Sequence, residues 1–277
     1  MVILHGSDLQ VGRPYRPWAA QAFVELAHAL RPDLVVVAGD LTQRAKAREY
    51  RVARILLDAL APLPVVVTPG NHDVPLYRIW ERLLTPYRNW RRYLGAALDA
   101  VTRVPGATVV ALNSSAPRRA VVGGRLDARQ LGIARETFAA APRGDLRIVV
   151  THHHFVRPPD GLGGRPLPGA EALLRALEGM GVDVILGGHV HQTHLLTSRA
   201  LVEGVDPGIP LVACGTTASS RGRGAETGEN SLNVVRIDAG AVRVESRRLG
   251  KQGSFVPVGE RVFARQRVAG STSEVPV

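Results

Sequence analysis

Hydrophobic residues along the first two thirds of the chain alternate between short apolar runs and longer segments with helical spacing. The apolar runs are residues 2–4, 33–38, 65–68, 146–151 and 182–186. Segments such as 19–30 and 44–61 place apolar residues three or four positions apart, which predicts amphipathic helices. The run at 33–38 is too continuously apolar for a half-exposed strand and predicts a central parallel strand. Strands and helices in this order predict a layered α/β domain whose sheet is covered on both faces.

The pattern changes near residue 191, where helical segments give way to further short strands. These strands are predicted at residues 195–200, 211–214, 232–237 and 242–249. They predict a second, more antiparallel sheet. The Gly- and Pro-rich segment 157–168 is long enough to form the rim of a cleft, and segment 218–230 is predicted to be a mobile loop. Periodicity is weak after residue 250, so we expect one domain over 1–250 and a C-terminal extension or tail over 251–277.

The stretch from Trp80 to Tyr93 has the most unusual composition, because its aromatic residues are interleaved with arginines. One interpretation is an amphipathic helical excursion whose aromatic side chains pack on the core. The other is a lid over a site, or a surface that makes peripheral contact with a membrane, since basic and aromatic helices suit lipid headgroups.

Composition places the chain among globular proteins and leaves the meaning of its charge open. It has 277 residues, 45% of them hydrophobic, and a formal net charge of +11. No apolar run reaches membrane-spanning length, and the first strand follows Met1 without a basic leader, so we expect a cytoplasmic protein. Almost all basic residues are arginine, so the charge indicates either an anionic partner or a genome-wide codon bias.

Polar residues that bind metals follow five of the predicted strands. They are Asp8, Asp40, Asn71, the histidine run 152–154, and His189 with His191. We expect all five positions to lie on one edge of one sheet, where the side chains can converge. Carboxylate and amide oxygens mixed with imidazoles suit Mn, Fe or Zn. There are too many ligands for one tetrahedral ion, so the set predicts a two-metal hydrolytic centre with a shared carboxylate.

These residues resemble the ordered motifs of calcineurin-like metallophosphoesterases. The matching motifs are Asp8-x-Gln10, Gly39-Asp40, Gly70-Asn71-His72-Asp73, a histidine at 152–153, and Gly188-His189-Val190-His191. The run at 39–45 is most similar to class III cyclic nucleotide phosphodiesterases and related bacterial enzymes. The resemblance implies a four-layer α/β/β/α sandwich with the metal site at the carboxyl ends of the strands. It also implies a metal-dependent phosphoric ester hydrolase with two divalent or trivalent ions, Mn, Fe or Zn.

The resemblance further implies a role for each residue. Asp40 would bridge both ions; Asp8, Gln10 and His191 would complete one site, and Asn71, His152 and His189 the other, with His153 as the reserve for His152. His72 and Asp73 would be catalytic: His72 would lie beside the phosphate, positioned by Asp73, and protonate the leaving alkoxide as an imidazolium. The implied reaction is in-line attack on phosphorus by a metal-bound hydroxide.

Gln10 departs from the family pattern, which has histidine two residues after the first aspartate. A glutamine oxygen is a weaker donor, so the first site should hold its ion less tightly. The leading interpretation is a phosphodiesterase for a small phosphodiester or nucleotide-type substrate. One alternative is a pyrophosphatase for a nucleotide-linked lipid of the UDP-diacylglucosamine type, and another is a catalytically weakened metal-dependent binding protein. Nucleic acid is a less favoured substrate, because no aromatic stacking platform accompanies the charge.

Overall fold

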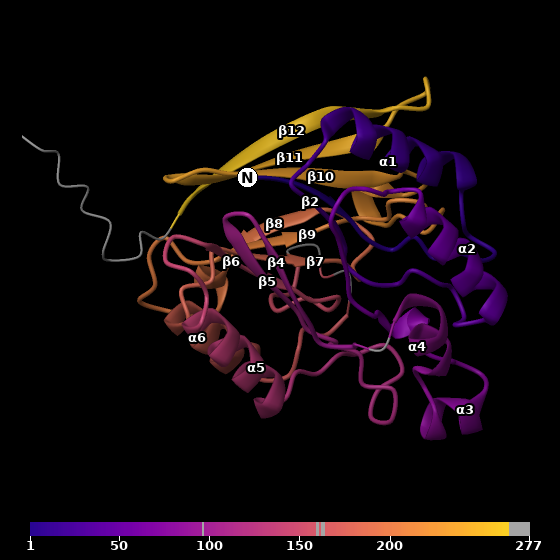
Figure 1. Cartoon of the computed structure of the whole chain (residues 1–277), viewed down its shortest axis with the longest axis horizontal. Helices are drawn as coiled ribbons and strands as arrows, with labels where there is room; N and C mark the ends of the chain where they lie inside the picture. Colours follow the sequence, from indigo (N-terminus) through magenta and orange to yellow (C-terminus); the bar gives the residue numbers. More distant parts are fainter. Residues whose placement is uncertain (96, 159–160, 162–163, 266–277) are drawn as a thin grey trace, which may run out of the picture.

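The computed structural model describes residues 1–95, 97–158, 161 and 164–265, and two six-stranded sheets form its centre (Figure 1). The first sheet has the order β12-β11-β10-β1-β2-β3. Its strands are β1 (Val2–Gly6), β2 (Leu34–Val37), β3 (Val65–Val67), β10 (Ser231–Ile237), β11 (Ala241–Leu249) and β12 (Phe255–Ala264). β1, β2 and β3 are parallel, whereas β10, β11 and β12 continue the sheet in antiparallel pairs.

The second sheet has the order β4-β5-β6-β7-β9-β8. Its strands are β4 (Ala100–Val104), β5 (Ala107–Ala111), β6 (Leu146–Val150), β7 (Val184–Gly187), β8 (His194–Thr197) and β9 (Pro210–Ala213). The four inner strands β5, β6, β7 and β9 are parallel, and β4 and β8 are antiparallel edge strands. Purely parallel strands need both faces covered, so this arrangement requires a layer on each side.

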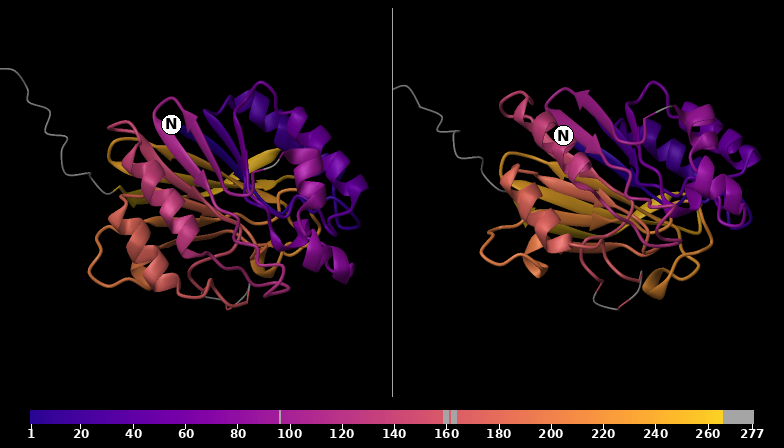
Figure 2. Two further views of the ribbon diagram at one scale, coloured as in Figure 1. Left: turned by 60° about the horizontal axis from the view of Figure 1, so that its bottom comes forward. Right: turned by 90° about the horizontal axis from the view of Figure 1, so that it is seen from below.

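Helices supply the two outer layers. α1 (Pro17–Leu30), α2 (Ala47–Asp58) and α4 (Arg88–Leu94) pack on the first sheet, and α5 (Ala128–Ala139) and α6 (Ala170–Gly179) pack on the second (Figure 2). The remaining helices are α3 (Ile79–Leu84) and the 3-10 turns η1 (Asn71–Asp73), η2 (Ser198–Ala200) and η3 (Gly224–Glu226). The predicted four-layer α/β/β/α sandwich is therefore confirmed.

Alternation along each central strand builds the layers. Ile3 faces the second sheet, whereas its neighbour Leu4 faces α1 and packs in one cluster with Phe23. Side chains of a strand point to opposite faces in turn, so a strand buried on both faces is apolar at every position. This explains the continuous apolar runs of the sequence, because the two sheets bury one face of each strand and the helices bury the other.

We had expected the strands after residue 191 to form a sheet of their own, but they do not. β8 and β9 join β7 in the second sheet, whereas β10 pairs with the free edge of β1 in the first. The expectation was wrong because an apolar alternation predicts a strand but not its neighbour. Pairing depends on which sheet edge is free when the chain returns, and that information is not local.

The segment expected to be an extended or frayed tail contains an ordered strand. Residues 255–264 form β12, which pairs with β11 along nearly its whole length. Only Phe255 and Phe263 in this edge strand are buried, so no period-two pattern marks it in the sequence. The last residues of the predicted tail, 266–277, and parts of the predicted rim loop, 159–160 and 162–163, lie outside the described residues.

The arginine-rich aromatic stretch divides into two helices with opposite environments. Trp90 of α4 is only 2% exposed and packs in the core, with Tyr93 partly buried against the same cluster. In α3, by contrast, Trp80 is 77% exposed and Leu84 is 70% exposed. The packed interpretation is therefore correct for α4 and wrong for α3. Among the described residues, no helix is both long and apolar enough to cross a membrane.

Candidate metal centre

The predicted ligands come from both sheets and not from one, which corrects our expectation. Asp8, Asp40 and Asn71 follow β1, β2 and β3 of the first sheet, whereas His152 and His189 follow β6 and β7 of the second. The loops of the two sheets meet at one edge of the sandwich, where the backbone N–H of His189 donates to Oδ2 of Asp8 at 3.0 Å. Ligands that follow strands of two stacked sheets therefore still meet at one edge of the sandwich.

The backbone is strained at these positions. Five of the seven non-glycine residues with positive φ in the described chain are predicted ligands: Asp8 (54°), Gln10 (48°), Asp40 (53°), His189 (75°) and His191 (60°). A left-handed conformation costs a non-glycine residue roughly 1–3 kcal/mol and persists where the surrounding structure enforces it. Such residues cluster at functional sites, so the strain marks this edge as a site on grounds independent of side-chain chemistry.

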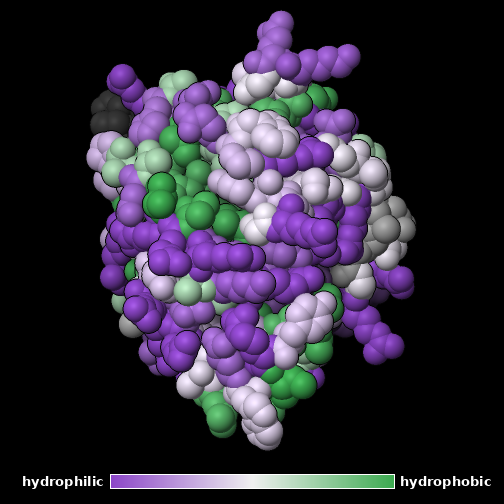
Figure 3. Space-filling view, turned by 90° about the vertical axis from the view of Figure 1, so that its right-hand side faces the viewer, coloured by the Kyte–Doolittle hydropathy of each residue, from purple (hydrophilic) through white to green (hydrophobic). Residues whose placement is uncertain are grey.

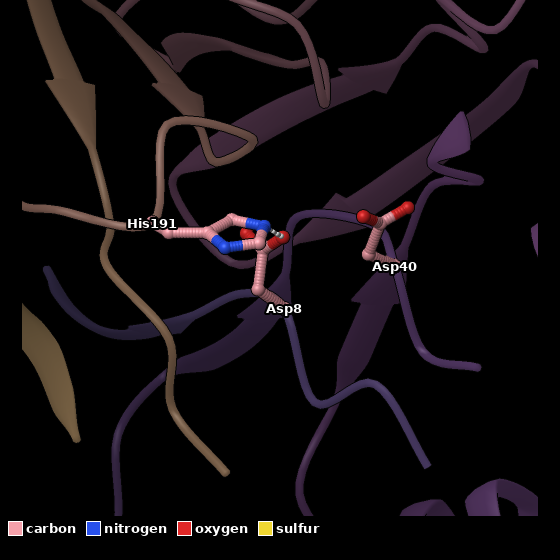
Figure 4. Close-up of side chains that lie close together, drawn as sticks. All are labelled: Asp8, Asp40 and His191. Atoms are coloured by element: carbon pink, nitrogen blue, oxygen red, sulfur yellow. Dashed lines mark ion pairs between the residues drawn. The ribbon is translucent and has the colours of Figure 1, made fainter. Parts of the chain in front are cut away.

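Asp8 and His191 lie against each other, and their ligand atoms are close to those of Asp40 (Figure 4). Oδ2 of Asp8 accepts hydrogen bonds from Ser7 Oγ at 2.6 Å and from the backbone N–H of His189. Its Oδ1 lies 3.1 Å from His191 Nε2 but lacks a hydrogen-bonded partner, because the two atoms do not align as donor and acceptor. Ligand atoms of Asp8, Asp40 and His191 all lie within 4.8 Å of one another.

Asp40 lies between the two groups of ligands. Its Oδ1 accepts the backbone N–H of His72 at 2.8 Å, and its Oδ2 lies 3.4 Å from His152 Nε2. Burial alone would lower the pKa of His152, but the Asp40 carboxylate, together with smaller contributions from Asp8 and the Ala38 carbonyl, outweighs burial and raises that pKa to about 9. The centre therefore stabilises positive charge next to Asp40.

Hydrogen bonds to backbone carbonyls fix the ring orientation of two histidines. Nδ1 of His152 donates to the carbonyl of Ala38 at 2.7 Å, and Nδ1 of His191 donates to the carbonyl of Arg221 at 2.9 Å. A histidine that donates from one nitrogen presents the lone pair of the other, which is how protein metal ligands are oriented. Both Nε2 atoms therefore face the centre as acceptors of a metal.

The geometry favours His152 over its neighbour His153 as a ligand. Both ring nitrogens of His153 are engaged elsewhere, with Ser114 Oγ at 2.8 Å and the Val122 carbonyl at 2.9 Å. The His152 ring lies 5.2 Å from the His189 ring between centroids, and Nδ1 of His189 lies 3.0 Å from Asn71 Oδ1. Asn71, His152 and His189 thus form a second group beside Asp40.

Gln10 does not present its oxygen to the centre, although the sequence led us to expect it. Its Oε1 accepts a hydrogen bond from Ser219 Oγ at 2.9 Å, and its Nε2 lies 3.2 Å from His191 Nε2. An amide N–H₂ group has no lone pair for a metal, so ligation by Gln10 requires its amide to turn over. Ser219 opposes that rotation, because its hydroxyl also accepts the backbone N–H of Arg221 at 3.1 Å.

Asp73 fixes the loop and does not contact the His72 imidazole, contrary to our expectation. Its buried carboxylate accepts the backbone N–H groups of Leu41, Thr42 and Gly70 at 3.1, 2.8 and 3.0 Å and the Thr42 hydroxyl at 2.9 Å. The His72 ring is oriented instead by the Gln43 carbonyl, 3.0 Å from Nδ1.

Gly70 is required by a close approach and not by its own backbone conformation. Its backbone is extended, with φ −104° and ψ −179°, a conformation open to any residue. A Cβ at this position would lie 2.1 Å from Oδ1 of Asp40, which is far too close. Gly70 therefore allows the β3 loop to approach the central carboxylate.

Two arginines at the centre were not identified from the sequence as site residues. Nη1 of Arg221 lies 3.0 Å from His72 Nε2, and Nη1 of Arg44 lies 3.1 Å from His72 Nδ1 and donates to the Gln43 carbonyl at 2.8 Å. Nε2 of His72 itself lies 4.0 Å from Oδ2 of Asp40. Two guanidinium groups beside the centre suit an anionic substrate such as a phosphate ester. Arginines are so frequent in this chain that neither position stood out.

The residues present fit metal ions. Oδ1 of Asp8 and Nε2 of His152 are buried atoms without a hydrogen-bond partner, and a buried unpaired polar atom is costly unless something binds it. The donor set combines two carboxylates with imidazoles and an amide oxygen, which suits divalent transition metals. A four-layer sandwich with such a set at one edge defines a metal-dependent hydrolase.

Comparison with known proteins gives the family. A profile of the calcineurin-like phosphoesterases matches residues 1–193. The chain is 30% identical over 257 residues to a cAMP/cGMP dual specificity phosphodiesterase of Mycobacterium tuberculosis, covering 87% of this chain and 74% of that protein. It is also 28% identical over 254 residues to a probable cyclic nucleotide phosphodiesterase of Rhodococcus erythropolis, covering 86% and 76%.

A solved structure shows the same fold. A dimetal phosphatase from Danio rerio aligns with a TM-score of 0.63 and 12% identity, over 96% of this chain and 99% of that one. The chain belongs to the calcineurin-like phosphoesterase family and is a metal-dependent phosphoesterase. The resemblance noted in the sequence is thereby confirmed.

Proposed function

We propose that this protein is a phosphodiesterase for small, nucleotide-type phosphodiesters, acting with two metal ions, Mn, Fe or Zn. The observation that supports it most is the convergence of Asp8, Asp40 and His191, together with two buried atoms that have no hydrogen-bond partner, Oδ1 of Asp8 and Nε2 of His152. In this proposal Asp8 and His191 hold one ion, with Gln10 if its amide turns over. Asn71, His152 and His189 hold the other, and Asp40 bridges the two.

When bound, the two ions would activate water and neutralise phosphate oxygens. The chain's own groups then bind and orient the ester. Arg44 and Arg221 donate hydrogen bonds to its oxygens. When Arg221 turns from Nε2 of His72 to the ester, that nitrogen is free to carry a proton from water and to deliver it to the leaving alkoxide. Nδ1 of His72 donates to the Gln43 carbonyl and holds the ring in place. Asp73 holds the loop that places Asn71 and His72.

The names of the two similar proteins support the nucleotide-type substrate, because one is a cAMP/cGMP phosphodiesterase and the other a probable cyclic nucleotide phosphodiesterase. The test is hydrolysis of bis-p-nitrophenyl phosphate and of cyclic nucleotides, glycerophosphodiesters and nucleotide-linked lipids with added Mn, Fe or Zn. We expect turnover in the native protein, loss with Asp40→Ala, and a large decrease with His72→Ala. The matched control is His28→Ala, an exposed histidine on α1. No turnover of any diester would support a metal-dependent binding protein instead.

A second candidate, a pyrophosphatase for a nucleotide-linked lipid, is favoured by the surface of α3. Trp80 and Leu84 are exposed beside the arginines of this segment. Figure 3 shows hydrophobic residues among hydrophilic ones at the lower end of this face, and further hydrophobic residues in its upper part. Apolar side chains among cationic ones suit an anionic membrane surface.

Vesicles containing anionic lipid test this candidate. Trp80→Ser with Leu84→Ser should abolish vesicle binding if α3 meets the membrane. Trp18→Ser is the matched control, since Trp18 is 62% exposed on α1. Trp90 is unsuitable for this test because it lies in the core. Absence of vesicle binding by the native protein would reject the candidate.

A further inference from the structure

A large basic groove opens directly beside the metal centre. It encloses about 1160 Å³ between residues 11–17, residues 43–52 and residues 220–221. Its inner end is formed by Gln43, Arg44 and Arg221, all of which contact the His72 ring. A substrate bound at the centre would therefore extend into this groove.

Positive charge dominates the lining. Five cations line the groove: Arg13, Arg44, Lys46, Arg48 and Arg221. The single carboxylate among the lining residues, Glu49, is buried and uses Oε2 to accept the backbone N–H groups of Arg44 at 2.7 Å and Lys46 at 3.2 Å. The acid thus shapes the start of α2, and a guanidinium is not its hydrogen-bond partner.

Three of these cations lack partners. No ion pair joins Arg13, Lys46 or Arg48 to any residue in the described part of the chain. Further along α2, by contrast, Arg54 pairs with Asp58. Unpaired, exposed cations around a concave surface attract anions and hold them by charge-assisted hydrogen bonds.

The walls of the groove are held together before anything binds. The backbone N–H of Ser220 donates to the Pro14 carbonyl at 2.8 Å, and that of Arg16 donates to the Ala218 carbonyl at 2.8 Å. Tyr15 also forms a β-bridge with Ser219. A groove whose two walls are joined in this way loses little freedom on binding, which favours affinity.

The size of the groove exceeds the needs of a single phosphodiester. Small-molecule sites enclose roughly 300–1,000 Å³, and this groove lies beyond the metal ligands themselves. We infer that it binds a second phosphate group of the substrate, while the scissile phosphate lies at the metal centre. The preferred substrates are then phosphodiesters that carry another phosphate, from a nucleotide or from a phosphorylated polyol. This inference rests on the proposed phosphodiesterase function.

Two substrate pairs that differ by one phosphate test it. The first pair is the dinucleotide ApA and its phosphorylated form pApA, and the second is glycerophosphoinositol and glycerophosphoinositol phosphate. We expect the native enzyme to have a kcat/KM about tenfold or more higher for the phosphorylated member of at least one pair. A preference in the first pair identifies nucleotides as the source, and a preference confined to the second pair identifies polyols.

Variants connect the preference to the groove. Arg13→Ser with Arg48→Ser should reduce the ratio within the pair at least about fivefold. Arg135→Ser with Arg143→Ser removes two exposed arginines outside the groove and serves as the control of equal charge. The ratio is measured within each variant, so folding and metal loading cancel. Equal kcat/KM within both pairs, or a ratio unchanged by the groove variant, would overturn the inference.

Hydrolysis of bis-p-nitrophenyl phosphate separates the two proposals. If the native enzyme hydrolyses this ester but shows no preference within either pair, the groove inference alone fails. If it hydrolyses no diester with any metal, the proposed function fails and the inference fails with it.

Discussion

The two halves of the proposed metal centre, which would share Asp40, differ in how completely their donor atoms face the centre. In the half formed by Asp8, Gln10 and His191, the amide oxygen of Gln10 points to Ser219 and its amide nitrogen lies beside His191. In the half formed by Asn71, His152 and His189, Nε2 of His152 lies 3.4 Å from Oδ2 of Asp40 without a hydrogen-bond partner, and Oδ1 of Asn71 lies 3.0 Å from Nδ1 of His189, another ligand of the same half. Fewer protein atoms would hold the first ion, so the two ions should differ in affinity.

Removal of the shared carboxylate should have the largest effect, because it weakens both halves at once. Asp40→Asn keeps the shape of the side chain and removes its charge. We expect loss of both ions and a decrease in kcat/KM of about 10³-fold or more. Metal content by mass spectrometry and diester hydrolysis check this. Asp58→Asn, which changes an exposed carboxylate on the end of α2, is the control. Retention of both ions by Asp40→Asn would show that Asp40 does not bridge them.

The neighbouring residues His152 and His153 offer the next test, which concerns only the half of the centre that holds the second ion. His152→Asn should lose one ion and retain the other, with activity reduced about 10²-fold. His153→Asn should keep both, because both nitrogens of His153 bond away from the centre. Thermal unfolding is measured for each, since both side chains are buried. Loss of an ion from His153→Asn and not from His152→Asn would reverse the assignment.

Replacement of Gln10 tests the half of the centre that holds the first ion. Gln10→His supplies an imidazole at a position where the amide oxygen points away from the centre. The first ion should therefore bind about tenfold more tightly. The measurement is metal content during progressive chelation of the native protein and the variant. We expect one ion to leave the native protein first and this difference to shrink in the variant. Equal retention of both ions in both proteins would contradict the proposed weakness of the first half.

The sequence predicted those residues of this centre that lie directly after the end of a strand. Asp8, Asp40 and Asn71 each come directly after an apolar run, and the carboxyl ends of parallel strands place such residues together. The layers were predictable for a related reason, because strands buried on both faces have no polar positions. The assignment of ligands to one sheet was wrong, because alternation says nothing about which strands pair.

The parts that could not be predicted depend on contacts between distant loops. Ser219 and Arg221 lie in a Gly- and Ser-rich segment without periodicity, which we interpreted as mobile. The segment is fixed by a β-bridge between Tyr15 and Ser219, more than two hundred residues apart, and by the hydrogen bond that Nδ1 of His191 donates to the Arg221 carbonyl. The contacts of Asp73 could not be predicted for a similar reason, because most of its partners lie on the β2 loop.

Ser219 provides the smallest effect and the most specific test of the difference between the halves. Its hydroxyl holds Oε1 of Gln10, so Ser219→Ala should release the amide to turn its oxygen toward the centre. One neutral hydrogen bond contributes about 1 kcal/mol, so we expect the first ion to bind up to about fivefold more tightly. In the Gln10→His background the same change should have no such effect, because no amide remains to turn. Chelation curves for the native protein, the two single variants and the double variant measure the coupling between the residues. Ser219→Ala could instead weaken binding of the first ion equally with histidine and with glutamine at position 10. Ser219 would then support the loop in general, and the orientation of the Gln10 amide would not explain the difference in affinity between the two ions.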